Sequence, residues 1–281
     1  MKVSVITVCL NANNVIANCL KSVAGQTYPA IEHVVIDGGS TDGTIETAKS
    51  YPHVACFVSE PDSGIYQAMN KGVSKATGEF LIFLNADDVF AAPDALEVAM
   101  NTIKKLPHVD VAYGSLHVRE KNGNSFIFHP PPPKEAPEFL VGGCLPHQST
   151  LARRVVFEKT NAFNEEFRIF GDYDWFLKIF ADPTIKIERI DSVLGSYFWG
   201  GISTNLRLGQ PELYHIQNGA ALFASREWDK RRILLYQAQL LELKLQLEEF
   251  QRERQIQKSQ AVKLKKSKFM RMVPWLRIVN R

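Results

Sequence analysis

The chain has 281 residues and lacks the motifs that identify several large classes of protein. It contains no GxGxxG and no GxxxxGK[ST] segment, which excludes the two common glycine-rich phosphate cradles. No apolar run approaches the ~20 residues that a membrane-spanning helix needs. No recognisable nucleic-acid-binding motif is present, so a nucleic-acid partner is not expected. These absences favour an ordinary globular enzyme or binding protein.

Cysteine is scarce, with four residues at Cys9, Cys19, Cys56 and Cys144. None belongs to a CxxC pair, and the spacing is typical of neither a zinc site nor a disulfide framework. Because a chain of this length buries a sizeable core without covalent cross-links, we expect reduced thiols. The short apolar start, Val3–Leu10, is interpreted as a buried strand and not as a signal peptide. These features predict a cytoplasmic protein.

Positive charge is concentrated at the C-terminal end. Residues 252–281 contain ten Lys and Arg and one acid, a net charge of +9, which leaves −6 for residues 1–251 of the total of +3. Within residues 263–281 the basic residues alternate with apolar and aromatic ones, as in segments that bind membrane interfaces. We therefore predict peripheral binding to an anionic membrane surface, the inner face of the cell membrane. A nucleic-acid-binding tail and a disordered solubilising tail are the alternatives.

Strand-like and helix-like segments alternate over the first 114 residues. The β-rich runs are Val3–Val8, His33–Ile36, Val54–Val58, Phe80–Leu84 and Val109–Tyr113. The segments with helical spacing are Val15–Val23, Thr41–Ser50, Ile65–Ala76 and Pro93–Lys105. This order predicts an α/β fold with a mostly parallel sheet flanked by helices on both faces.

The pattern changes after Gly114. Leu116–Phe128 is predicted to be a hairpin, because it contains an Asn-Gly turn signal. Residues 226–266 contain no Gly or Pro, and their apolar residues have the spacing of a short coiled-coil seam. We therefore predict one domain over residues 1–210 and a helical extension over residues 211–281. Residues 226–260 are a candidate homodimer contact, with folding back onto the body as the alternative.

Polar and acidic side chains follow the ends of the first four predicted strands. In strand order they are Thr7 and Asn11, then Asp37, then Glu60 and Asp62, then Asn85, Asp87 and Asp88. In open α/β sheets ligands bind beyond the carboxyl ends of the strands. Helix capping or a solvated loop explains any one of these residues, but their recurrence at consecutive strands predicts a common site.

An acidic crevice repels a bare phosphate unless a cation lies between them. Carboxylate oxygens are the ligands that Mg²⁺ and Mn²⁺ prefer, and either ion can bridge the oxygens of a diphosphate. The sequence therefore predicts a divalent-metal site, Mg²⁺ or Mn²⁺, that holds a nucleotide diphosphate.

Four segments, VSVITVCLNANN, VIDGGSTDGT, SEPDSGIYQAMNKG and ATGEFLIFLNADD, occur in the order and at the spacing of a known family. They resemble the donor-binding half of the family 2 inverting glycosyltransferases, which have the GT-A fold. GGCLPHQSTLARR and GDYDWFLKIF resemble the acceptor-side half, and the likeness covers roughly residues 1–205. Among known members, the chain resembles bacterial enzymes of surface-polysaccharide assembly, of the colanic acid, capsule and O-antigen type.

The resemblance implies the transfer of one sugar from a nucleotide-diphosphate sugar to an acceptor hydroxyl, with inversion and metal assistance. The processive synthases of the wider family carry transmembrane helices and a QxxRW motif, and both are absent here. A single addition per acceptor is therefore expected. By analogy, and prompted by the basic tail, we expect the acceptor to be a saccharide or a lipid-linked saccharide.

The resemblance also implies roles for donor-side positions. Thr7, Asn11 and Asp37 would line the nucleoside pocket, with Asp37 meeting the base. Asp62 would contact the donor, and Lys71 would approach a phosphate. Capping of the following helix is the structural alternative for Asp37, and a solvated helix face is the alternative for Lys71.

The segment 85–88 occupies the place of the family's DxD metal motif, with Asn85 in place of the first acid. Asp87 is expected to bind the metal and the donor, and Asp88 to be a second ligand or a ribose partner. Asp172 matches the family's general base, although Gly171 replaces the glutamate that usually precedes it.

Four further residues match the acceptor-side half: His147, Gln148, Asp174 and Trp175. The structural alternatives are a hydrogen-bonded histidine, a helix N-cap and an aromatic core residue.

Two other functions remain as alternatives. A nucleotidyltransferase of related fold would need a basic, glycine-rich loop after the first strand, where this chain has LNANN. A non-catalytic nucleotide-sugar-binding or scaffold protein is favoured by Asn85 and Gly171. The retained Asp87, Asp88 and Asp172 argue against it.

Overall fold

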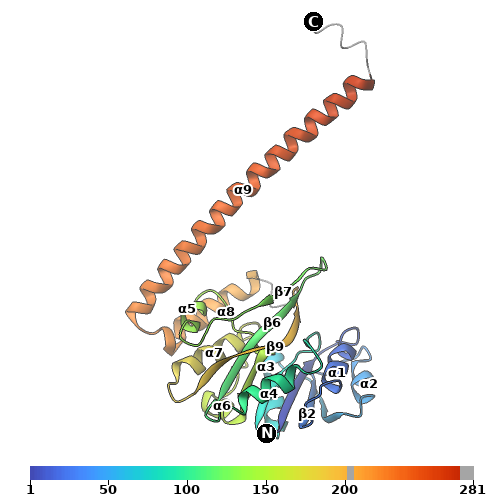
Figure 1. Ribbon diagram of the computed structural model, residues 1–281, viewed down its shortest axis with the longest axis vertical. Coiled ribbons are helices and arrows are strands. Elements are labelled where there is room, and N and C mark those ends of the chain that lie inside the picture. The colour runs from blue at the N-terminus through green and yellow to red at the C-terminus, as the bar shows by residue number, and fades with distance from the viewer. Residues whose placement is uncertain (201–205, 273–281) are drawn as a thin grey trace. The chain divides into compact units, whose positions relative to one another are not determined.

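The computed structural model describes residues 1–200 and 206–272 (Figure 1). The chain divides into two compact units, Met1–Ser225 and Arg226–Arg281. The boundary expected after residue 210 falls inside helix α8 (Leu206–Gly219). This helix belongs with the first unit, because the buried Gln217 amide donates a hydrogen bond to the Val141 carbonyl.

Four parallel strands form one half of the sheet, in the order β3-β2-β1-β4. They are β1 (Val3–Cys9), β2 (Ile31–Asp37), β3 (Val54–Ser59) and β4 (Phe80–Phe83). Every residue of β1 is buried, because this strand lies between two others and under helices on both faces. The crossover helices are α1 (Ile16–Ala24), α2 (Thr44–Lys49) and α3 (Ile65–Lys75).

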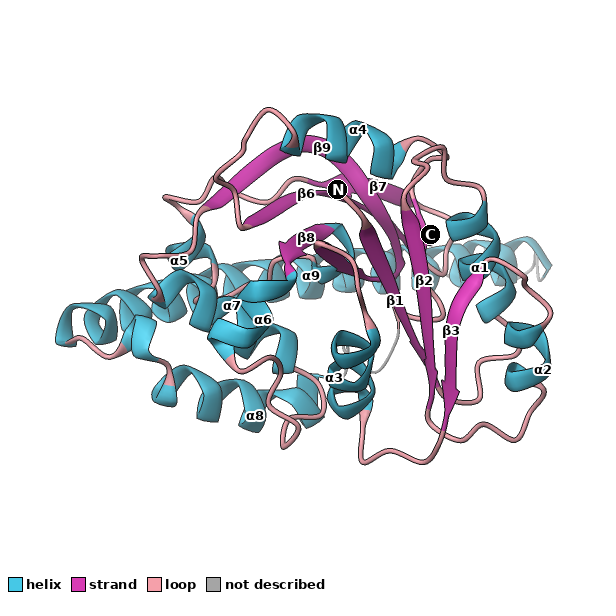
Figure 2. Cartoon of the chain, turned by 90° about the horizontal axis from the view of Figure 1, so that it is seen from below, coloured by secondary structure: helices cyan, strands magenta, loops and turns pink. Residues whose placement is uncertain are grey.

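The two faces of β1 pack against different helices. Val3 and Val5 join a core cluster with residues of α1 and of α4 (Ala95–Ile103). Ile6 points to the other face and contacts α3, where a Cβ on Gly72 would lie 2.4 Å from the Ile6 side chain. Figure 2 shows α3 and α4 on opposite sides of the sheet. The predicted α/β layering is therefore present.

The other half of the sheet contains both parallel and antiparallel pairs, whereas a mostly parallel sheet was predicted. Antiparallel β8 (Thr150–Arg153) lies between β4 and β6 (Val111–Arg119). The remaining strands are β9 (Ile187–Phe198), parallel to β6, with β5 (Val89–Phe90) and β7 (Ser125–Phe128). The reason for the difference is β8, which comes late in the chain and inserts beside β4 in the reverse direction. The predicted hairpin is confirmed as β6 and β7.

β9 is a single strand of 12 residues. It stays continuous because the β6–β9 pairing absorbs two register shifts, between Tyr113 and Ser115 and between Ser115 and His117. The irregularity brings backbones close together, since a Cβ on Gly114 would lie 2.4 Å from the Ser192 carbonyl oxygen.

Shorter helices complete the first unit: α5 (Ala136–Phe139), α6 (Arg154–Thr160), α7 (Gly171–Ala181) and the 3₁₀ turns η1 (His147–Ser149) and η3 (Ala221–Phe223). η1 and α7 carry the acceptor-side residues predicted from the sequence.

In the second unit, residues 226–272 are described by the structure and form the helix α9 (Arg226–Met272), of 47 residues. The predicted seam is on its surface, with Leu243 62% and Phe250 61% exposed. In the part of the chain that the structure describes, no helix has both the length and the apolar character needed to span a membrane. The basic segment predicted to bind membranes begins within α9, and its last residues, 273–281, lie outside the described residues.

Candidate active site

The loops after β1, β2 and β3 meet at one edge of the sheet, as predicted. Parallel pairing places Cys9 opposite Asp37, and Asp37 opposite Ser59. Asn11 follows β1 in the left-handed region, at φ 49°, which asparagine tolerates better than most residues. Its Oδ1 accepts a hydrogen bond from the Thr41 backbone N–H at 3.0 Å, which fixes the loop after β1 to the loop after β2.

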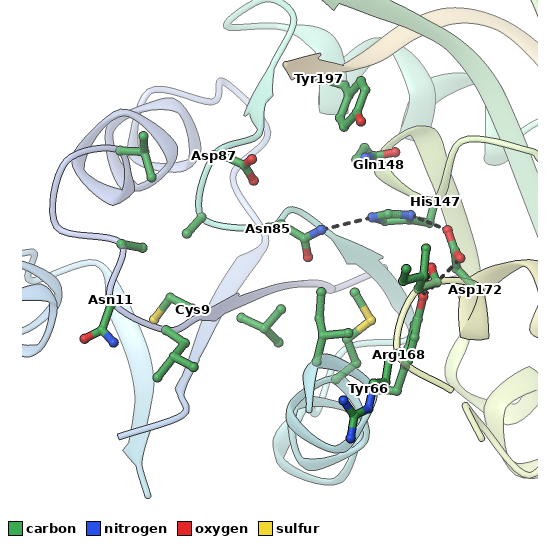
Figure 3. Close-up of a pocket in the computed structure, with 18 residues that line it drawn as sticks. Cys9, Asn11, Tyr66, Asn85, Asp87, His147, Gln148, Arg168, Asp172 and Tyr197 are labelled. Atoms are coloured by element: carbon green, nitrogen blue, oxygen red, sulfur yellow. Dashed lines mark hydrogen bonds and ion pairs between the residues drawn. The ribbon is translucent and has the colours of Figure 1, made fainter. Parts of the chain in front are cut away.

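A cavity of about 420 Å³ opens at this edge (Figure 3). Six residues predicted from the sequence line it: Asn11, Asn85, Asp87, His147, Gln148 and Asp172. The first three come from loops of the parallel half of the sheet, and the other three come from η1 and α7. The structure therefore brings together donor-side and acceptor-side residues that lie up to 161 positions apart in the chain.

Asp172 is the best-anchored acid of this cavity. It lies in the first turn of α7, where the helix dipole favours a negative charge. The Tyr173 backbone N–H donates to its Oδ1 at 2.9 Å, and its Oδ2 lies 2.9 Å from Nδ1 of His147. The Tyr66 hydroxyl lies 3.2 Å from Oδ1 and 2.7 Å from the Ile169 carbonyl. These contacts fix the direction of the carboxylate, as a general base requires.

His147 connects the base to the end of β4. Burial lowers the pKa of its imidazole, but the hydrogen bond and negative charge of Asp172, with smaller effects of Asp88 and Asp87, outweigh burial and raise it. Its Nε2 lies 3.4 Å from the Asn85 side-chain nitrogen. One ring therefore contacts both Asp172 and the segment 85–88.

The substitution of glycine for glutamate at position 171 has a steric explanation. A Cβ on Gly171 would lie 2.8 Å from the Tyr66 ring, a distance that real Cβ atoms essentially never show. Tyr66 is buried, and burial followed by the charge of Asp172 raises its pKa well above the usual value. The Tyr66 ring therefore occupies the space beside residue 171, and its neutral hydroxyl lies 3.2 Å from Oδ1 of Asp172.

The DxD segment presents buried oxygens without protein partners. Asp87 lines the cavity, while Asp88 is 1% exposed. Among the described residues, neither carboxylate oxygen of Asp88 nor Oδ1 of Asn85 has a hydrogen-bond partner. Burial, together with the charge of Asp87, raises the pKa of Asp88 to about 7, and weaker opposing effects of His147 and Gln148 do not cancel this.

An unpartnered buried carboxylate is costly unless it is protonated or faces a cation. Asn85 and Asp87, which line the cavity, fit a divalent ion that prefers oxygen ligands, whereas Asp88, predicted as a second ligand, does not line the cavity. Within the described residues there is no cluster of three or more His, Cys, Asp or Glu suited to metal binding. An ion held here would rely on few protein ligands, with donor phosphates and water completing its shell, as is usual for Mg²⁺.

Four predicted donor-side residues do not line the cavity. Thr7 is fully buried, with Oγ1 3.0 Å from Nε2 of His33. The Asp37 carboxylate accepts hydrogen bonds from the Ser40 backbone N–H at 2.9 Å and from Ser59 Oγ at 2.7 Å. Burial alone would raise the pKa of Asp37, but hydrogen bonds from the Ser40 hydroxyl, the Ser59 hydroxyl and the backbone of Ser40 and Gly39 lower it by more, so the net shift is downward. Asp37 therefore holds the loop after β2 and does not cap the following helix, whose N-cap is Gly43.

Asp62 and Lys71 stabilise the loop that leads into α3. Asp62 Oδ1 accepts a hydrogen bond from the Gly64 backbone N–H at 3.0 Å. Lys71 Nζ forms an ion pair with Glu60 at 3.0 Å. Both side chains therefore already have partners within their own loop and helix.

Asp174 and Trp175 lie away from the predicted acceptor side. Asp174 pairs with Lys178 one helical turn later, at 2.8 Å. Trp175 is 2% exposed, stacks on Phe157 with ring centroids 4.7 Å apart, and donates its indole N–H to Thr160 at 3.0 Å. Trp175 is therefore a core residue, although it lies only three positions after Asp172 on the same helix.

Three cavity residues were missed from the sequence: Tyr66, Arg168 and Tyr197. Arg168 supplies positive charge to an otherwise acidic crevice, and the Glu212 carboxylate of α8 accepts a hydrogen bond from its backbone N–H at 2.8 Å. In the sequence, Arg168 could have been noticed only as a single positively charged residue four positions before Asp172. Tyr66 and Tyr197 gave no signal, because a strand or helix tyrosine is as often a core residue.

A second cavity, of about 400 Å³, adjoins the first. The two share the lining residues His147, Gln148, Asp172 and Tyr197. The candidate base therefore lies on the wall common to two cavities.

Comparisons with known proteins agree with this geometry. The model of the family described as "Glycosyl transferase family 2" matches residues 4–160. The chain is 32% identical over 211 residues to a PGL/p-HBAD biosynthesis glycosyltransferase of Mycobacterium bovis, covering 72% of this chain and 79% of the relative. It is 28% identical over 224 residues to an uncharacterized glycosyltransferase of Rickettsia prowazekii, covering 75% and 69%.

Solved structures share the fold. S. aureus TarS 1-349 in complex with UDP-GlcNAc has a TM-score of 0.63 and 20% identity, over 77% of this chain and 64% of that chain, so the match spans less than two thirds of it. The mannosyltransferase PcManGT from Pyrobaculum calidifontis, in complex with GDP-Man and Mn²⁺, has a TM-score of 0.54 and 19% identity, over 86% and 80%. The fold class predicted from the sequence is confirmed. The family model covers more than half of the chain and several relatives are glycosyltransferases, so the chain belongs to glycosyl transferase family 2.

Proposed function

We propose that the chain transfers one sugar from a nucleotide-diphosphate sugar to an acceptor hydroxyl, with inversion at the anomeric carbon. The observation that supports this most is the position of Asp172 on the wall shared by the two cavities. A donor in the first cavity and an acceptor in the second would meet at this carboxylate. Inversion in one displacement needs a single base on the acceptor side, and one anchored acid fits that need.

In this proposal Asp172 takes the proton of the acceptor hydroxyl as the new bond forms. His147 and the Tyr173 N–H keep its carboxylate pointing at the shared wall. Arg168, which lines the first cavity, offsets negative charge on the diphosphate of the donor. A Mg²⁺ or Mn²⁺ ion held by Asp87, with Asn85 and Asp88, would offset the charge that develops on the leaving nucleoside diphosphate.

The relatives suggest the substrate classes. TarS and PcManGT were each solved with a nucleotide-diphosphate sugar, the latter with Mn²⁺, which supports that donor class and that ion. The M. bovis relative is named for PGL/p-HBAD biosynthesis. We extend the proposal to a saccharide or lipid-linked acceptor at the inner face of the cell membrane. The basic segment of residues 263–281 would bind anionic lipid, and residues 226–260 would form a homodimer.

The test is incubation of the purified chain with a panel of nucleotide sugars, in Mg²⁺, Mn²⁺ or EDTA. Thermal stabilisation and release of nucleoside diphosphate are measured in the same samples. We expect one donor to stabilise the fold and to be slowly hydrolysed, both only with metal. Stabilisation without any release, in every condition, would instead favour the non-catalytic nucleotide-sugar-binding or scaffold alternative. No response to any donor would overturn both.

A further inference from the structure

The β6–β7 hairpin presents one apolar face and one mixed face. Strand pairing places Leu116 opposite Phe128 and Val118 opposite Phe126, and all four side chains line the second cavity. Ile127, between the two phenylalanines, does not line it. This is the alternation expected of a strand, where successive side chains point to opposite faces. One face of the hairpin is therefore an apolar wall.

The apolar lining continues beyond the hairpin. It contains Phe139 of α5, whose ring centroid lies 5.8 Å from that of Phe128, and Leu145 and Pro146 of the segment before η1. A Cβ on Gly143 would lie 2.5 Å from the Phe139 ring, so glycine leaves room for the ring in the wall. Trp199, 54% exposed, lies at the border of the cavity.

Hydrogen-bonding side chains gather at one end of the second cavity. They are those shared with the first cavity, His147, Gln148, Asp172 and Tyr197, with the weakly polar Cys144 beside Asp172, its Sγ 4.0 Å from Oδ2. A sugar buried among Leu116, Val118, Phe126, Phe128 and Leu145 would find no side-chain hydrogen-bond partner for its hydroxyls there, at a free-energy cost for each. An aryl or alkyl group has no such cost and gains from burial there.

Building on the proposed function, we propose that the acceptor is a glycoside whose apolar aglycone lies next to the sugar that presents the reactive hydroxyl. The hydroxyl would lie at Asp172, the sugar among the shared polar residues, and the aglycone against the apolar wall that the hairpin and Phe139 form together. The second cavity, of about 400 Å³, includes the polar end and the apolar lining. It holds about one sugar ring and one aryl or short alkyl group. An acceptor whose lipid lies many sugars from the reactive hydroxyl would not use this wall.

The experiment compares methyl, phenyl and octyl glycosides of the same hexose, for several hexoses. Binding is measured by calorimetry and by tryptophan fluorescence, to which Trp199 contributes. We expect the phenyl and octyl glycosides to bind at least about tenfold more tightly than the methyl glycoside, from the apolar area that they bury. Their binding should also show a more negative heat-capacity change.

Neighbouring residues on β7 provide matched variants. Phe126→Ser removes a ring that lines the cavity, whereas Ile127→Ser removes an apolar side chain from the other face. Both positions are exposed, 47% and 39%, so neither change should prevent folding, and thermal melts check this. Phe126→Ser should reduce the preference for the phenyl over the methyl glycoside at least about threefold, and Ile127→Ser should leave it unchanged.

Equal affinity for the methyl and phenyl glycosides would overturn the inference, as would equal effects of the two variants or no binding of any glycoside. Release of nucleoside diphosphate from the donor alone is measured in the same preparations. Release without an apolar preference contradicts this inference and leaves the transferase proposal intact. Absence of donor binding and release contradicts the proposed function itself.

Discussion

The two halves of the sheet build their parts of the site in different ways. In the parallel half, successive strands end at one edge, and the loops after β1 and β4 bring Asn11 and Asp87 to the cavity directly. In the mixed half, Asp172 and His147 come from α7 and η1, 25 positions apart, and meet through tertiary contacts. The donor side is therefore determined by local strand order, and the acceptor side by long-range packing. Variants that separate the two sides test this comparison.

The largest effect is expected at the base in the mixed half. Asp172→Asn keeps the size of the side chain but cannot accept a proton from the acceptor, so transfer should fall about 10³-fold. Donor affinity, which depends on the parallel half, should stay within about twofold. Initial rates and donor thermal shifts measure the two effects.

Asp174→Asn is the matched control, on the same helix but paired with Lys178. It should change the transfer rate less than about twofold, because Asp174 does not line either cavity. Equal losses in both variants would show that the helix, and not the base, was disturbed.

A large effect on donor binding is expected from Asp87→Ala in the parallel half. Loss of a carboxylate that lines the cavity should weaken metal-dependent donor binding by about 10²-fold. Asp62→Ala should weaken donor binding less than about threefold, because the Asp62 carboxylate caps its own loop at Gly64. Titration of the donor with Mn²⁺ or EDTA measures both. A larger loss for Asp62 than for Asp87 would restore the sequence-based expectation for Asp62.

What the sequence predicts follows the same division. The four parallel strands, the shared edge and the position of Asp87 follow from local patterns, because each strand and its loop are contiguous in sequence. Antiparallel β8 beside β4 does not follow, since its pairing joins Phe80 to Arg153 across 73 positions. The cavity position of Tyr66 also depends on a distant neighbour, Gly171. Trp175 was assigned to the acceptor side because the motif does not state which face of α7 is buried.

A smaller effect is expected where the halves meet, between α3 and α7. Gly171→Ala places a Cβ 2.8 Å from the Tyr66 ring and should lower the free energy of unfolding by about 1–3 kcal/mol. In a Tyr66→Ala background the same change should cost less, because the ring is absent. Urea unfolding of the four proteins in this cycle gives the coupling. Equal costs in both backgrounds would mean that Tyr66 is not what excludes a side chain at position 171.

The smallest effect is expected from a buried histidine of the parallel half. His33 is 1% exposed, and burial followed by the neighbouring His53 lowers its pKa to about 3. The unfolded chain binds this proton near pH 6.5, so the contribution of His33 to stability is complete above that pH. It falls as the pH decreases from 6.5 towards 3, by at most about 1.4 kcal/mol per pH unit. Urea unfolding between pH 7.5 and 5 should show this slope, and His33→Gln should reduce it. An unchanged slope in His33→Gln would assign the acid sensitivity to titratable groups other than this core position. His147, in the mixed half, differs from His33 in that its pKa is raised.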